Sequence, residues 1–218
     1  MATDSWGGVR ARIRRLRWSR HRGKVFGADG HRFALRPPLR LDQLAQIEAQ
    51  FGTALPEEYR SFLTTVGAGG AGPGYGLFPL ARDRAAGRWA WLGDGAELTD
   101  LDALARDFAP GDLSGDQHRL QQQLPPPQDT DAYASWQRSW EDLLHAPGRT
   151  DGAACVCHLG CGWQVWLILH GPDAGRIWLD DRGAGIDLEP ALGRDGNPHT
   201  FTSWYLSWLA GAESTITS

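Results

Sequence analysis

The sequence predicts an α+β fold in which an antiparallel sheet is flanked by helices at both ends of the chain. Two kinds of pattern support this class: helical apolar spacing near both ends, and alternating β-type segments joined by glycine turns between residues 153 and 179. The chain has 218 residues with 41% hydrophobic content, which suffices for a sizeable core without disulfides. No apolar run reaches the ~18 residues of a membrane span.

Five segments have the apolar spacing of amphipathic helices. Helices over residues 41–51 and 57–66 form a helical hairpin, with Gly52 after the first and Pro56 opening the second. Further helices are expected at the arginine-rich start, around residues 133–144, and from Phe201 to an end at Gly211. The aromatic stripes of these helices are interpreted as core positions. The stripes comprise Tyr59 and Phe62; Tyr133, Trp136 and Trp140; and Phe201, Trp204, Tyr205 and Trp208.

The strand-like segments are shorter. Residues 153–159, 163–170 and 176–179 predict a three-stranded meander, and residues 77–80 and 89–92 predict two short strands. An Asp-Gly turn at 29–30 predicts a hairpin between residues 24–28 and 32–35. A helix is expected over 98–108. We therefore divide the chain into an N-terminal extension, residues 1–36, and a domain, residues 37–212, with a polar insertion at about 94–149.

Charge is distributed unevenly along the chain. Residues 1–40 contain 11 of the 22 basic residues and only two acids, so they carry about +9 and the remainder about −13. The arginines either bind phosphate or an acidic partner, or form the solvated face of a helix whose apolar side is Val9, Ile13 and Leu16. The acidic remainder argues against a nucleic-acid-binding protein and fits a basic protein partner. Three cysteines and no signal peptide predict a cytoplasmic location.

A glycine-rich stretch, residues 67–76, resembles a phosphate-binding loop only superficially. A helix precedes it, a strand follows it and it has no lysine, so a nucleotide site is disfavoured. We expect instead positive φ angles or close backbone contacts, with Tyr75 at the rim.

Cys155, Cys157, His158 and Cys161 form a dense cluster of metal-ligand types. Alternation along a strand separates His158 from the two preceding cysteines, so buried free thiols are expected in place of a zinc site. A Cys161 nucleophile with His158 or His170 lacks an orienting third group. No catalytic residue, metal or cofactor is predicted.

The order of motifs resembles that of the SUKH superfamily, Smi/Knr type. Residues 55–63, LPEEYRSFL, resemble its LPxxYRxFL helix, and residues 69–80 resemble the glycine-rich turn that follows. Later segments, residues 160–162, 170–172, 175–178 and 180–182, are similar to its central hairpins, and residues 201–209 resemble its closing helix. Residues 94–149 match no motif of the family.

The resemblance implies a curved sheet with flanking helices and a protein without catalysis. Bacterial members are taken as immunity proteins that bind and silence a toxin, often a nuclease. This implies an immunity protein that occludes a cognate, basic toxin; the alternatives are a regulatory or scaffold module and a small-ligand site beneath the glycine-rich loop. Aromatic and acidic residues are the preferred partner-binding candidates: Tyr75, Trp89, Trp91, Asp180, Asp181 and Asp187.

Overall fold

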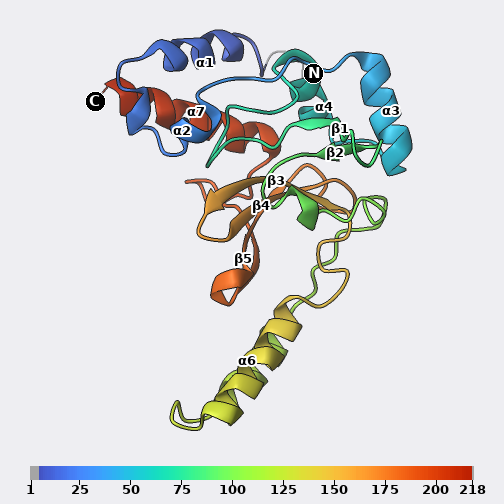
Figure 1. The fold of residues 1–218 in the computed structure, drawn as a ribbon, viewed down its shortest axis with the longest axis vertical. Helices are drawn as coiled ribbons and strands as arrows, with labels where there is room; N and C mark the ends of the chain where they lie inside the picture. The colour runs from blue at the N-terminus through green and yellow to red at the C-terminus, as the bar shows by residue number, and fades with distance from the viewer. Residues whose placement is uncertain (1–4, 218) are drawn as a thin grey trace.

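A computed structural model describes residues 5–217 and has the expected α+β architecture (Figure 1). A helical layer covers one side of the sheet. It contains α1 (Val9–Trp18), α2 (Ala28–His31), α3 (Leu41–Phe51), α4 (Glu57–Thr65) and α7 (Phe201–Thr217). Helices α1 and α7, from the two ends of the chain, pack against each other within this layer. Helices from both ends of the chain therefore flank the sheet, as the sequence predicts.

The sheet is an antiparallel meander of four strands. Its order is β3 (Ala153–Gly160), β4 (Trp163–Ile168), β5 (Ile177–Asp181) and β6 (Ile186–Pro190). The first three strands confirm the predicted meander; β6 was not predicted. A separate two-stranded ribbon pairs β1 (Leu80–Arg82) with β2 (Trp89–Trp91). The register places Trp166 opposite Trp178, and Trp178 opposite Pro190, on one face of the sheet.

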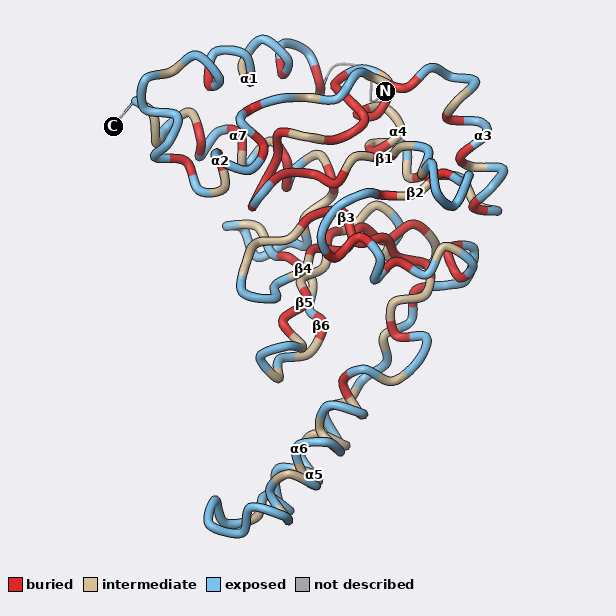
Figure 2. The backbone as a smooth tube through the Cα atoms, viewed as in Figure 1, coloured by how far each residue is buried: buried red, intermediate tan, exposed pale blue. Residues whose placement is uncertain are grey.

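Two helices project from the body. α5 (Ser114–Gln122) and α6 (Thr130–Leu144) lie side by side and are joined by the loop that contains residues 125–127. They extend from the side of the sheet opposite the helical layer (Figure 1). Figure 2 shows this hairpin as mostly exposed, in contrast to the buried centre of the molecule. We call residues 112–145 the arm.

The core lies between the helical layer and the sheet. Trp6, Phe62, Phe201 and Tyr205 form a cluster of aromatic rings with centroids 4.8–6.2 Å apart. The Tyr205 hydroxyl donates to the Ala71 carbonyl at 2.7 Å, so the closing helix is tied to the glycine-rich loop. All four residues of β4 from Val165 to Ile168 are buried, so both faces of this strand are covered.

Three local predictions are wrong, and tertiary contacts explain each. Residues 24–35 form a 3₁₀ turn and the short α2 in place of a hairpin, and Leu35 pairs with Gly70 of the glycine-rich loop. Residues 98–108 are mostly turns, because the Ala103 carbonyl and the Phe108 N–H bond to residues 152 and 170. Helix α7 continues past Gly211, where Glu213 pairs with Arg12 at 2.6 Å.

No helix within residues 5–217 is both long and apolar enough to span a bilayer.

His31 is a buried titratable group in the contact between α2 and α7. It is 7% exposed, its Nδ1 accepts from the Phe33 N–H at 3.0 Å, and its ring contacts the rings of Phe33 and Trp208. Its Nε2 has no hydrogen-bond partner among residues 5–217. Desolvation lowers the pKa of His31 from 6.5 to about 4.

We predict that this histidine makes folding sensitive to acid. Its folded pKa lies below the unfolded value, so the unfolded state takes up the proton first and stability falls as pH decreases from about 6.5 towards 4. The slope from this one group reaches at most about 1.4 kcal/mol per pH unit. In His31→Asn the amide oxygen can still accept from the Phe33 N–H. The free energy of unfolding, measured with urea at several pH values in this range, should then depend less steeply on pH than in the wild type. Equal slopes in both proteins would contradict the assignment.

Candidate partner-binding site

The arm presents an aromatic stripe that its own two helices only partly cover. In α6, Trp136 stacks against Trp140 with ring centroids 5.5 Å apart, and Tyr133 follows at 5.9 Å from Trp136. The Trp136 indole N–H donates to the Leu120 carbonyl of α5 at 2.6 Å. Tyr133 remains 38% exposed and Leu124, in the connecting loop, 43%. Trp136 and Trp140 are half-buried, against α5 and against the segment around Gly185, whereas Tyr133 is exposed, so the interpretation of this stripe as core is only partly right.

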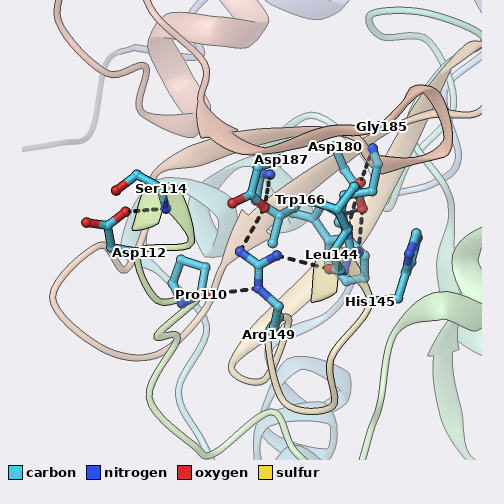
Figure 3. Close-up of polar contacts among 12 residues, drawn as sticks. Pro110, Asp112, Ser114, Leu144, His145, Arg149, Trp166, Asp180, Gly185 and Asp187 are labelled. Atoms are coloured by element: carbon cyan, nitrogen blue, oxygen red, sulfur yellow. Dashed lines mark hydrogen bonds and ion pairs between the residues drawn. The ribbon is translucent and has the colours of Figure 1, made fainter. Parts of the chain in front are cut away.

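The arm is attached to the body through a buried arginine. Arg149 is 6% exposed; its Nε donates to the Pro110 carbonyl at 2.8 Å, before the arm, and its Nη1 to the Leu144 carbonyl at 3.0 Å, at the end of α6. Its Nη2 lies 2.7 Å from Asp187 Oδ1 of β6 (Figure 3). One guanidinium thus links both ends of the arm to the sheet.

A second guanidinium reinforces this attachment. Arg182 Nη1 donates to the same Leu144 carbonyl at 3.2 Å, and the Trp140 indole donates to the Gly185 carbonyl at 3.2 Å. Two cations at the C-terminus of α6 complement the negative end of the helix dipole. We call Arg149, Arg182, Asp180 and Asp187 the anchor.

Asp180 is the counterion of Arg182. Its carboxylate lies 2.7 Å from Arg182 Nη2 and accepts from the Trp166 indole at 2.9 Å. Burial alone would raise the pKa of Asp180, but the hydrogen bonds and charge of Arg182 and the Trp166 N–H outweigh it and lower the pKa. The anchor is therefore a charge-balanced buried cluster and not an acidic surface.

The structure corrects four of the six predicted partner-binding residues. Trp89, Trp91, Asp180 and Asp181 are all between 3% and 9% exposed and cannot offer a surface to a partner. The Trp91 indole donates to the Tyr59 hydroxyl at 2.8 Å, and its ring stacks on Phe51. Asp187 is half-buried against Arg149. Tyr75 alone is well exposed, at 42%.

Tyr75 stands at the rim of a cleft of about 410 Å³ between the glycine-rich loop and the β3–β4 turn. Its ring stacks on that of His158 with centroids 4.8 Å apart and meets Phe26 edge-on at 5.4 Å. Asp94 and Glu97 line the cleft as well, so it combines an aromatic wall with two carboxylates. Such a surface suits a basic side chain of a partner.

The glycine-rich loop makes this arrangement sterically feasible. Gly70, Gly74 and Gly76 have positive φ angles, which confirms the predicted backbone conformation. A Cβ at Gly74 would lie 2.3 Å from the His158 carbonyl oxygen, so a side chain there would push the loop off β3. Tyr75 is positioned by this contact, because its N–H donates to the same carbonyl at 3.2 Å.

The residues of the cysteine cluster lie in different environments along β3 and the turn that follows it. Cys155 and Cys157 are buried free thiols, and Cys161 is exposed in the turn with a φ of 52°. Burial raises the pKa of Cys155 to about 12 and that of Cys157 in the same direction. His158 is occupied by ring contacts with Tyr75 and Phe78. Within residues 5–217, no three His, Cys, Asp or Glu side chains gather in a way that could hold a metal ion.

Sequence reasoning missed the anchor arginines, and it identified the arm stripe but assigned it to the core. The polar composition of residues 94–149 was the available signal: an aromatic helix in a segment with few apolar residues to cover it is a candidate for partner binding.

Comparison with family models identifies the fold. The model of the SMI1 / KNR4 family (SUKH-1) matches residues 38–183, about two thirds of the chain. The protein belongs to the SMI1 / KNR4 family. The SUKH-1 match runs from α3 to the end of β5, through the glycine-rich loop and the arm, and leaves α1, β6 and α7 outside it. Searches of curated proteins and of solved structures return no significant match.

We predict that removing the Arg149 guanidinium loosens the arm. Arg149→Met leaves Asp187 and the Leu144 carbonyl without this donor, so the free energy of unfolding should fall by about 2–3 kcal/mol. Breaking a fully buried ion pair would cost more, but Asp187 is partly exposed to solvent. Amide exchange in α6 should accelerate more than in β4. The control Arg138→Met, on the exposed face of α6, should stay within about 0.5 kcal/mol. Unchanged α6 exchange in Arg149→Met would show that the anchor does not hold the arm.

Proposed function

We propose that this SUKH-1 protein is a non-catalytic immunity protein that binds a cognate toxin in the cytoplasm and neutralises it by occlusion. Family membership supports a protein partner in general. The observation that carries the proposal for this chain is the arm, a projecting helical hairpin with a half-exposed aromatic stripe. Exposed tyrosine and tryptophan are the residue types enriched at the energetic centres of protein interfaces.

The charge of the arm indicates the kind of partner. Residues 112–145 contain six carboxylates and two arginines. Among the carboxylates, Asp131, Glu141 and Asp142 are exposed and belong to no ion pair within residues 5–217. A basic toxin, such as a nuclease with a phosphate-binding surface, would be attracted to this hairpin and its association accelerated.

The anchor supports the same function through rigidity. Binding by a mobile hairpin would cost conformational entropy, whereas an arm fixed at both ends by Arg149 is preorganised. The Tyr75 cleft, with Asp94 and Glu97, offers a second contact for basic side chains. We keep Tyr75 as a proposed partner-binding residue and place Asp187 among the residues that position the arm.

The direct test is co-purification from the native host followed by mass spectrometry. The tagged wild-type chain is compared with Tyr133→Ala/Trp136→Ala, in which the stripe is shortened. A polypeptide that is retained by the wild type, lost with the variant, toxic when expressed alone and harmless when co-expressed would establish the immunity function. A retained partner without toxicity would favour a regulatory or scaffold role.

We predict that charge reversal on the arm slows association with the partner. Asp131→Lys/Asp142→Lys changes the charge by four units and should lower the association rate at low salt by about tenfold or more. The folding stability should be unchanged because both side chains are exposed. The matched control is Asp102→Lys/Glu189→Lys, on exposed positions of the body. Equal association rates for the two double variants, measured by stopped-flow fluorescence, would exclude the arm as the steering surface.

A further inference from the structure

A second surface lies at the other end of the molecule, on α1. A groove of about 590 Å³ runs between this helix and the segment that contains Phe33 and Leu35. Its walls carry Arg10, Arg14 and Arg17, spaced one and two turns apart on α1, and the indole of Trp18. The apolar face of α1, which includes Ile13, is buried beneath them. The arginine-rich start is therefore both the solvated face of a helix and the wall of a groove.

Several of the cations on this face are not neutralised. Arg12 and Arg15 pair with Glu213, but Arg14 and Arg17 form no ion pair within residues 5–217. Arg10 donates to the Val66 carbonyl, which fixes its position, and like Arg14 and Arg17 it forms no ion pair within residues 5–217. Residues 5–40 contain 11 basic side chains and a single acidic one, Asp29. The groove thus lies within a strongly positive surface.

Trp18 is the most exposed large hydrophobic side chain among residues 5–217, at 77%. It stands at the last residue of α1, beside the groove, and makes no ring contact within the described chain. A tryptophan that contributes so little to the core is available as a stacking platform.

The composition of this face favours nucleic acid over protein as its ligand. Protein interfaces are enriched in arginine and tryptophan but have few other charges at their centres, whereas interfaces with nucleic acid are more polar and much more positive overall, as the surface around this groove is. Guanidinium groups bind phosphates in bidentate fashion, and an exposed indole stacks on an unpaired base. We propose that the groove binds single-stranded nucleic acid, with Arg10, Arg14 and Arg17 on successive phosphates and Trp18 against a base.

The acidic remainder of the chain limits the length of that ligand. Outside residues 1–40 the net charge is about −13, which repels any polyanion that extends beyond the positive face. A short single strand satisfies both conditions; a long duplex does not. The groove is remote from the arm, which leaves the opposite side of the molecule (Figure 1), so this site is independent of the proposed toxin binding.

The test uses a fluorescein-labelled oligothymidylate of about 12 nucleotides, a length within the range of known single-strand sites. Anisotropy titrations from about 20 to about 200 mM salt should give a slope of log K against log salt near −2, as three phosphate contacts on a single strand require. Arg14→Glu/Arg17→Glu should abolish binding. The control Arg138→Glu/Arg194→Glu makes the same charge change at exposed positions outside the groove and should weaken binding little.

Trp18→Ala separates stacking from charge. It should weaken binding by about tenfold or more and leave the salt slope unchanged, since no phosphate contact is lost. Circular dichroism and thermal unfolding will verify that each variant folds. Equal binding by the two arginine variants would overturn the proposal. A polyglutamate peptide that binds more tightly than the oligonucleotide, with no effect of Trp18→Ala, would overturn it in favour of an acidic protein ligand.

Discussion

The architecture of the projecting arm depends on one carbonyl group. The Leu144 oxygen ends α6 and accepts hydrogen bonds from two guanidinium groups, those of Arg149 and Arg182. Each guanidinium needs a counterion because isolated buried charge is costly, and Asp187 and Asp180 supply these charges from the sheet. The strands thus fix the direction in which α6 leaves the body. Asp180 and Asp187, which the sequence suggests are partner-binding acids, therefore serve to hold α6 in place.

Charge is separated along the long axis of the molecule. The arm, with six carboxylates to two arginines, and the arginine face of α1 lie at opposite ends (Figure 1). This separation has a physical basis in the fold: the positive helix is held by the Arg12–Glu213 pair and by the buried side chains Val9, Ile13 and Leu16. Neither charged end can neutralise the other within one chain, so each remains available to a ligand of opposite sign. The net charge of −4 conceals both.

The sequence predicted most elements whose stability is local. α3, α4, β3, β4 and β5 follow from apolar spacing and turn residues, and all appear near the expected bounds. Predictions failed where backbone N–H and C=O groups form hydrogen bonds with a segment far away in the sequence. Residues 98–108 have helical spacing, but the Phe108 N–H bonds to the His170 carbonyl at 3.1 Å, a partner that no local pattern indicates. The backbone at Gly27 lies directly against the Gly74 carbonyl. This segment therefore packs on the glycine-rich loop and does not form the predicted hairpin.

The candidate site was harder to predict than the fold because exposure is a non-local property. The Trp89-Ala90-Trp91 alternation indicates two indoles on one side of a strand, and a stripe of that kind is buried wherever a helix such as α3 lies over it. The stripe on α6 has the same local signature, but within residues 5–217 α5 and the segment around Gly185 cover it only in part. Periodicity identifies an apolar face; what lies opposite that face decides whether it is core or interface. In this chain the polar composition of the insertion around α6 is the feature that separates the two cases.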